Sequence, residues 1–302
     1  MLIRQRLRAL SRALPHARTG DPHAIHQARV ATRRLREALP VAACGAAGRR
    51  LERAVRRLTR VLGPVRELDV AVMMLDELAS RPEVPRAAVV CLQQAIRDER
   101  ARLHRGLTDI VDAGHLEKLT KRALAAARGR ERVTAARVPR DPAQLALALG
   151  RAARRAERVR ATVDNAAGIY LPDRLHDVRI AVKKLRYTME VARQLTGSRA
   201  RARIATLKRT QDLLGRMHDL EVLIARTRAV QGSPNAPDLR LSADLDQLVR
   251  RLEMECRQLH AQYIAGRAAL LSVCDHAIAS SVPASRRAGD GRKGKRHGAS
   301  AA

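Results

Sequence analysis

A basic segment that occurs twice is the feature that most constrains the fold of this chain. The first copy, IHQARVATRRLREAL, covers residues 25–39, and the second, LHDVRIAVKKLRYTM, covers residues 175–189. Each copy opens with an apolar residue and a histidine, His26 or His176, and then distributes cations through an apolar framework. Apolar residues spaced at helical intervals predict an amphipathic helix in each copy.

Another motif recurs in the same order along the chain. The stretch TRVLGPVRELDV, residues 59–70, aligns with DLLGRMHDLEV, residues 212–222, and the two share a Leu-Gly pair. In this alignment His218 takes the place of Arg66. Two motif pairs in one order predict a duplicated helical unit, with the copies packed about a pseudo-two-fold axis.

The composition favours an all-α fold. The chain has 302 residues, of which 46% are hydrophobic, enough to bury a sizeable core. It has no Phe, no Trp and only three Tyr, so Ala, Leu and Val must fill that core. Ala, Leu, Arg and Glu are strong helix formers, and no stretch shows the two-residue alternation of a half-buried strand. We therefore expect two four-helix bundles of long helices.

Glycine and proline positions divide the chain into the predicted helices. These lie at residues 1–14, 21–44, 49–62, 65–79, 86–111, 115–128, 141–167, 172–195, 199–214, 217–230 and 239–274. Gly63-Pro64 and Gly215 are interpreted as helix breaks. The helices are expected to form one domain over residues 1–280, with halves at about 1–130 and 140–280, followed by a disordered basic tail at 281–302.

On a helical wheel, each basic segment separates into two faces. The cationic arc spans about 80° and contains, in the two copies, His26, Arg29, Arg33 and Arg36, and His176, Arg179, Lys183 and Arg186. The opposite, apolar side contains Ala28, Ala31, Leu35 and Leu39, and Ala181, Leu185 and Met189. Arg34 and Lys184 lie a quarter-turn from the cationic arc. The apolar sides are expected to face the core.

The cationic faces are expected to be neutralised by an anion. Solvated helix faces normally interleave acids with cations, because like charges one turn apart repel. On this side of the wheel the acids are only Glu37 and Glu190, one late in or directly after each segment. The formal net charge of +30 also attracts polyanions, and codon preference for Arg over Lys does not explain it. Two cationic arcs of this kind are better suited to bind a chain of phosphates than one small ligand.

The candidate anion-binding residues are the cations of the two basic segments, together with cations of the neighbouring helices that correspond to each other in the two halves of the chain. They are His26, Arg29, Arg33, Arg34, Arg36, Arg56 and Arg57, and His176, Arg179, Lys183, Lys184, Arg186, Lys208 and Arg209. The repeated acids that we expect to bridge to cations and orient this surface are Glu67, Asp69, Asp219 and Glu221. His26 and His176 lack a carboxylate three or four residues on, so we interpret them as phosphate donors rather than metal ligands. No metal site, cofactor or catalytic residue is predicted.

These motifs resemble those of the CHAD domain, the conserved histidine α-helical domain. The resemblance rests on His-x-x-Arg-Val-Ala-Thr-Arg-Arg-Leu-Arg, its second copy and Leu-Gly-x-x-Arg-Glu-x-Asp-Val, and it extends over residues 1–275. It implies two four-helix bundles with a basic cavity or surface between them, and binding of inorganic polyphosphate, often at polyphosphate granules. Many relatives also carry a triphosphate tunnel domain, whose ExExK element this sequence lacks.

The leading hypothesis is a non-catalytic, cytoplasmic polyphosphate-binding protein that associates with granules. Non-specific binding to the DNA backbone is the alternative, although three tyrosines make a poor stacking platform and no groove-reading motif occurs. A metal-dependent phosphoanhydride hydrolase is the third hypothesis, but the sequence has no GxxxxGK[ST] loop. No apolar run approaches the ~18–20 residues that span a membrane.

Overall fold

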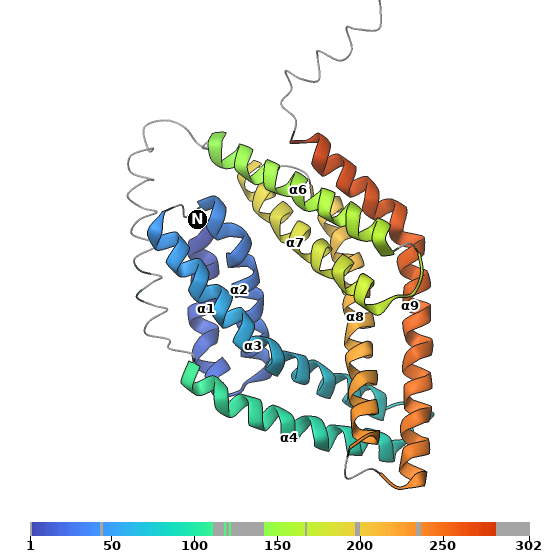
Figure 1. Cartoon of the computed structure of the whole chain (residues 1–302). Coiled ribbons are helices and arrows are strands. Elements are labelled where there is room, and N and C mark those ends of the chain that lie inside the picture. The colour runs from blue at the N-terminus through green and yellow to red at the C-terminus, as the bar shows by residue number, and fades with distance from the viewer. Residues whose placement is uncertain are drawn as a thin grey trace, which may run out of the picture.

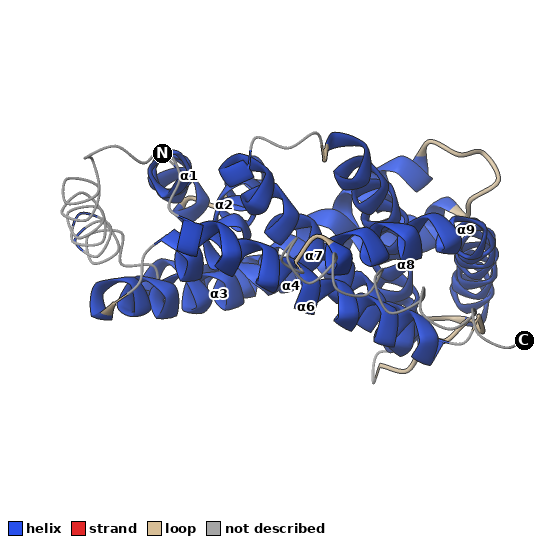
Figure 2. Cartoon of the chain, turned by 90° about the horizontal axis from the view of Figure 1, so that it is seen from above, coloured by secondary structure: helices blue, strands red, loops and turns tan. Residues whose placement is uncertain are grey.

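The computed structural model describes residues 2–42, 45–110, 142–166, 168–196, 200–233 and 237–281, together with Lys118 and Lys121. All regular elements in these ranges are α-helices, which confirms the predicted all-α class (Figure 2). Most of the predicted helix at 115–128 lies outside the described residues, and so does the basic tail after Ser281. None of the helices in the described ranges is long and apolar enough to cross a membrane.

The helices follow one another with short connections in each half of the chain (Figure 1). The first four are α1 (Leu2–Arg18), α2 (Pro22–Ala42), α3 (Ala46–Ala79) and α4 (Arg86–Ile110). The next four are α6 (Pro142–Ala166), α7 (Pro172–Thr196), α8 (Arg201–Gln231) and α9 (Leu239–Ala279). The two basic segments therefore lie on α2 and α7, each of which begins at a proline, a residue suited to the first helical position.

Both predicted helix breaks are wrong. α3 continues through Gly63-Pro64, and α8 continues through Gly215. A glycine costs a helix about 1 kcal/mol and a proline about 3 kcal/mol relative to alanine. Burial of an aliphatic side chain contributes about 1.5–3 kcal/mol, and Leu58, Leu62 and Val65 are all buried around the break predicted in α3. Tertiary packing therefore outweighs the local preference.

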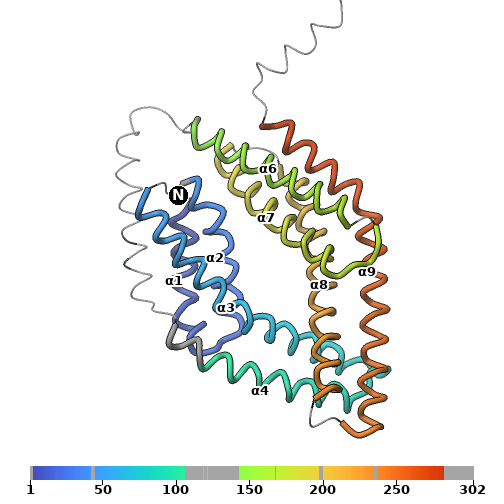
Figure 3. Tube along the Cα trace, in the orientation of Figure 1, coloured from blue at the N-terminus to red at the C-terminus, as the bar shows by residue number. Residues whose placement is uncertain are grey.

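The apolar core forms two clusters that do not coincide with the two halves of the chain. One cluster joins α1, α2 and the first part of α3, up to Val65, and also includes Ala148 of α6 and Val191 and Ala192 of α7. The other joins α6, α7, α8 and α9 with α4 and the last part of α3, from Leu68 onward. α3 thus passes from one cluster to the other just after Gly63-Pro64. Figures 1 and 3 show α3 and α4 reaching the lower ends of α8 and α9, against which they pack.

The packing between the halves is consistent with the predicted duplication. α2 packs against α7, and α3 packs against α8, so equivalent helices meet at the centre of the molecule. In each half a histidine of the last helix also contacts the connection before the basic helix. The Nε2 atom of His104 lies 3.0 Å from the carbonyl oxygen of Arg18, and the His260 ring packs 5.3 Å from the ring of Tyr170. These contacts fix where α2 and α7 begin.

Candidate anion-binding site

The apolar sides of α2 and α7 face the core, as the helical wheel predicts. The seven residues of those sides are all buried: Ala28, Ala31, Leu35, Leu39, Ala181, Leu185 and Met189. α2 and α7 pack against each other, and Arg29 and Arg33 of α2 act electrostatically on Lys183 of α7, so the two cationic arcs approach each other where these helices meet.

A group of five half-buried cations comes from three helices, and we call it the central cluster. It consists of Arg29 and Arg33 on α2, Arg66 on α3, and Arg179 and Lys183 on α7. Within the described ranges, its α2 and α7 members form no ion pair with a carboxylate. The Nε atoms of Arg29 and Arg33 are buried and have no hydrogen-bond partner there. The central cluster is therefore a concentration of positive charge without direct counterions.

The mutual repulsion of these cations lowers their pKa values. Burial and the charges of Arg179, Arg33, Arg29 and Lys184 lower the pKa of Lys183 to about 7. Burial and the neighbouring guanidinium groups also lower the pKa of Arg29 to about 10. An anion placed among these groups would reverse both effects, because an opposite charge favours the protonated form.

The glycine of each Leu-Gly pair lies beside an arginine of the basic helix, and the approach is close at Gly63. A methyl group at Gly63 would lie 3.0 Å from the Nη1 atom of Arg29, and one at Gly215 would lie 4.0 Å from the Nε atom of Arg179. At Gly63 the absent side chain lets Arg29 lie close to α3, whereas at Gly215 a methyl group would meet only ordinary van der Waals contact. Close approach therefore accounts for the glycine in the first copy of the motif and not for the one in the second.

The histidines lie at the edge of the central cluster. The Nδ1 atoms of His176 and His218 are 3.1 Å apart, so α7 and α8 meet through two imidazole rings. Burial and the charges of Arg179, His176 and Lys183 lower the pKa of His218 to about 4. The pKa of His26 is also lowered, first by burial and then by Arg66. No group of three potential metal-ligating side chains occurs in the part of the chain that the structure describes.

The four predicted supporting acids have different positions. Asp69 is buried and accepts a hydrogen bond from Arg100 Nε at 2.6 Å, and Arg100 also donates to the carbonyl of Gly20 at 2.6 Å. This arrangement ties α3 and α4 to the turn before α2. Glu221 accepts a hydrogen bond from the hydroxyl of Tyr170. Asp69 and Glu221 therefore hold the connections that precede the two basic helices.

The other two acids act on the central cluster itself. Asp219 lies close enough to Arg179 and Arg66 for both guanidinium groups to favour its ionised form, against the burial that raises its pKa. Glu67 forms an ion pair with Arg226 at 3.5 Å, and its charge also reaches Arg29 and Arg179. These carboxylates moderate the positive charge of the cluster without forming ion pairs with Arg29 or Arg179.

Several predicted binding residues have acidic partners away from the central cluster. Arg186 is buried, forms an ion pair with Glu190 at 2.6 Å and lies over the Tyr187 ring at 4.3 Å. Arg34 also pairs with Glu190, at 3.6 Å. Glu190 thus neutralises part of the second basic row.

The paired cations of α3 and α8 are exposed. Arg56 and Lys208 form ion pairs with acids of their own helices, at 2.6 Å with Glu52 and at 2.9 Å with Asp212. Arg57 is exposed, and Arg209 donates a hydrogen bond to the Thr206 hydroxyl at 3.1 Å. The sequence pattern places these cations on the surface, but no contact among the described residues joins them to the central cluster.

Two predicted residues, Arg36 and Lys184, lie instead beside α6. Burial and the charges of Arg155, Arg36 and Arg158 lower the pKa of Lys184. None of the α6 arginines was predicted from the sequence as a binding residue. The sequence feature that could have identified them is the spacing of cations in GRAARRAERVR. This spacing places Arg151, Arg155 and Arg158 on one side of a helix.

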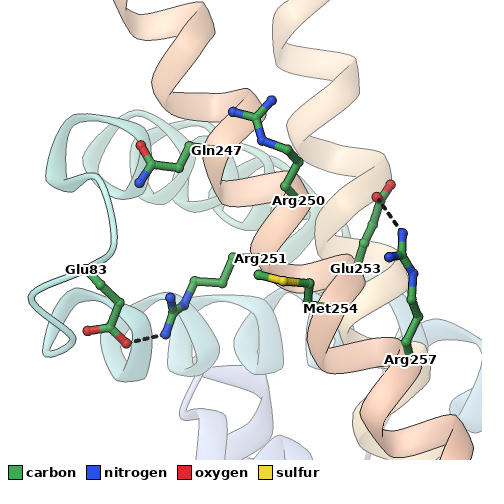
Figure 4. Close-up of a pocket in the computed structure, with 7 residues that line it drawn as sticks. All are labelled: Glu83, Gln247, Arg250, Arg251, Glu253, Met254 and Arg257. Atoms are coloured by element: carbon green, nitrogen blue, oxygen red, sulfur yellow. Dashed lines mark hydrogen bonds and ion pairs between the residues drawn. The ribbon is translucent and has the colours of Figure 1, made fainter.

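A separate pocket lies on the side of α9 (Figure 4). It has a volume of about 420 Å³ and is lined by Glu83, Gln247, Arg250, Arg251, Glu253, Met254 and Arg257. Two of its arginines are neutralised within it, because Arg251 pairs with Glu83, and Arg257 pairs with Glu253 at 3.7 Å. This pocket has a more balanced charge than the central cluster.

In the part of the chain that the structure describes, the fold is all-α, and the central helices α2 and α7 carry cations that have no carboxylate partner there. The family model of the CHAD domain matches residues 1–228, so the chain belongs to the CHAD domain family. This finding confirms the resemblance stated from the motifs. Membership is compatible with a polyphosphate-related function.

Two solved structures share the fold. PptA from Streptomyces chartreusis has a TM-score of 0.58 at 15% sequence identity, covering 88% of this chain and 96% of that chain. The CHAD domain from the plant Ricinus communis has a TM-score of 0.53 at 22% identity, covering 92% of this chain and 89% of that chain. No curated protein matches this chain.

Proposed function

We propose that this protein binds inorganic polyphosphate at the central cluster and does not cleave it. The observation that supports this proposal is the unpaired state of the α2 and α7 cations within the described residues. Removing a charge from water costs several kcal/mol unless a partner compensates. A polyphosphate chain supplies one negative charge per phosphate unit, and arginine forks match phosphate oxygens in geometry.

The geometry favours polyphosphate over a nucleic acid. The only tyrosines are Tyr170, Tyr187 and Tyr263; Tyr187 and Tyr263 are buried, and Tyr170 is bonded to Glu221. They therefore provide no exposed platform on which bases could stack. The central cluster is also half-buried between helices, where a thin phosphate chain enters more readily than a duplex.

A binding role is also favoured over hydrolysis. Metal-assisted phosphoryl transfer uses carboxylates that are free to hold Mg²⁺. Of the four repeated acids, Asp69 is bonded to Arg100, Glu67 to Arg226 and Glu221 to Tyr170, which leaves Asp219 as the single one without a bonded partner among the described residues. One carboxylate alone is fewer than the cluster that holds Mg²⁺ for phosphoryl transfer. We accordingly propose a binding protein that associates with polyphosphate granules in the cytoplasm, a location that a fluorescent fusion would test.

A competition experiment tests the proposed function. Long-chain polyphosphate and duplex DNA compete for the purified protein across a chloride series, while phosphate release is measured in parallel. We expect a clear preference for polyphosphate, an affinity that falls steeply with salt, and no phosphate release. Preference for DNA, or phosphate release that is lost in Glu67→Gln, would overturn the proposal.

A variant of the central cluster locates the binding. Arg33→Gln combined with Lys183→Gln removes two unpaired cations, and Arg240→Gln combined with Arg250→Gln removes the same charge from exposed positions of α9. We expect the first pair to lower the affinity at least tenfold and to reduce the salt slope by about 2, or about 1 for each phosphate contact. The α9 control should stay close to the unchanged protein.

A further inference from the structure

A second group of cations lies beside the central cluster, and we call it the α6 group. It consists of Arg36 on α2, Lys184 on α7, and Arg155 and Arg158 on α6. α6 packs against both α7 and α2, and Glu37, next to Arg36, is bonded to Arg155 of α6 and to Thr188, one turn after Lys184 on α7. Three helices therefore bring these charges together, in agreement with the electrostatic influence of Arg155, Arg36 and Arg158 on Lys184. The α6 group, like the central cluster, therefore consists of cations that come from three helices.

One buried carboxylate, Glu37, lies within the α6 group. It accepts hydrogen bonds from Arg151 Nη2 at 3.3 Å and from the Thr188 hydroxyl at 3.1 Å, and it pairs with Arg155 at 3.7 Å. These contacts occupy both of its oxygen atoms. Glu37 explains why Arg151 and Arg155 are present, since a buried carboxylate needs such partners.

The remaining cations of the α6 group have no such explanation. Arg36, Lys184 and Arg158 form no ion pair with a carboxylate in the ranges that the structure describes. The single charge of Glu37 faces four cations of the group and Arg151, which leaves a large positive excess. A group that served only to satisfy Glu37 would need neither Arg158 nor Lys184.

The α6 group is continuous with the central cluster. Lys184 follows Lys183 directly and is one of the cations that lower its pKa. Arg36 lies about one helical turn beyond Arg33 on α2. A linear anion that leaves the central cluster along α2 and α7 therefore meets unpaired cations of the α6 group next.

We propose that the α6 group is a second phosphate-binding subsite, which holds the continuation of a polyphosphate chain seated in the central cluster. This proposal rests on the proposed function and specifies the ligand further. The protein should discriminate by chain length, because only a long chain reaches both groups. A short oligophosphate uses the central cluster alone.

The test measures the binding of tripolyphosphate and of long-chain polyphosphate to the full chain and two variants. Arg158→Gln combined with Lys184→Gln removes two unpaired cations of the α6 group without touching Glu37. Arg240→Gln combined with Arg250→Gln is the charge-matched control at exposed positions of α9. Circular dichroism checks that both variants keep their helices.

The α6 variant should bind the long chain about tenfold more weakly, with a salt slope reduced by about 2, and should bind tripolyphosphate unchanged. Unchanged long-chain binding, or an equal loss in the α9 control, would overturn the second subsite while leaving the proposed function intact. If the unaltered protein binds neither phosphate, the proposed function itself fails. An equal loss for both ligands would place Arg158 and Lys184 at a single shared site and also overturn the chain-length proposal.

Discussion

Lys183 illustrates how the surroundings of one residue determine what it can do. It faces cations from two helices, namely Arg29 and Arg33 of α2, and Arg179 and Lys184 of α7, and it also acts on His218 of α8. Burial and these charges lower its pKa to about 7. At neutral pH a large fraction of Lys183 is therefore uncharged before a ligand binds, and a bound polyanion would restore the proton.

Binding at the central cluster should consequently depend on pH. The bound state holds the Lys183 proton more tightly than the free state, so affinity is expected to fall as pH rises above about 7, by up to about tenfold per pH unit. Titration of long-chain polyphosphate between about pH 6 and pH 9 measures this dependence. Lys183→Arg should flatten it, because arginine stays charged throughout that range.

A matched substitution controls for loss of lysine in general. Lys208→Arg changes an exposed lysine that already pairs with Asp212, so the pH dependence should stay as in the unaltered protein. If Lys183→Arg retained the full pH dependence, Lys183 would not be the group that takes up the proton.

At this scale the sequence identified the cationic faces but not the partners of each cation. Helical periodicity alone determines that Arg29 and Arg186 lie on the cationic arcs. It does not show that Glu190 neutralises Arg186 whereas Arg29 has no such partner among the described residues. That difference depends on side-chain geometry and tertiary contacts, which a wheel does not contain.

Among the elements, α3 and α8 differ in how closely an arginine of the basic helix approaches their glycine. Gly63→Ala and Gly215→Ala should each gain about 0.5–1 kcal/mol from helix propensity. At Gly63 the added methyl would lie 3.0 Å from Arg29 Nη1, so the guanidinium must move; at Gly215 the closest atom, Arg179 Nε, is at 4.0 Å. We expect Gly215→Ala to be more stable with unchanged binding. Gly63→Ala should gain less and bind polyphosphate about threefold to tenfold more weakly.

Chemical denaturation and polyphosphate titration of both variants provide the measurements. Equal behaviour of the two alanine variants in binding would show that the position of Arg29 against α3 does not matter for the ligand.

The helix elements show where local signals are insufficient. Proline and glycine at Gly63-Pro64 predicted a break because the local cost is real. The continuous α3 depends on apolar partners that come from α1 and α2 on one side and from α4 and α8 on the other. Most other boundaries were predicted well, because the prolines that begin α2 and α7 act locally.

For the whole molecule, the formal net charge of +30 means that salt should change the melting temperature in opposite directions without and with a bound polyanion. Raising chloride from about 0.01 M to about 0.1 M shortens the Debye length from about 30 Å to about 10 Å, which screens self-repulsion. The melting temperature of the free protein should therefore rise by several degrees. With long-chain polyphosphate present, the same salt should lower the melting temperature, because it weakens the binding that stabilises the fold.

Thermal scans with and without polyphosphate at fixed protein concentration measure both trends. A free protein whose melting temperature falls with added chloride would contradict the view that unpaired cations destabilise it.

On this scale the sequence predicted the order of helices and their all-α character, because repeated motifs and periodic apolar residues act throughout the chain. It did not predict how the core divides. The division after Gly63-Pro64 depends on which helices α3 meets, and those contacts join residues far apart in the sequence, such as Leu75 of α3 and the second-half helices in one cluster.

The path of α3 through both core clusters has a consequence for how the chain unfolds. A cut between the halves would leave α4 and the last part of α3, with Leu68, Leu75 and Leu78, without the apolar surface that covers them. We therefore expect neither half to fold by itself, even though each carries its own copy of the motifs. Because α3 packs in both clusters, and α6 and α7 also contribute residues to the first one, we expect the chain to unfold in one cooperative step.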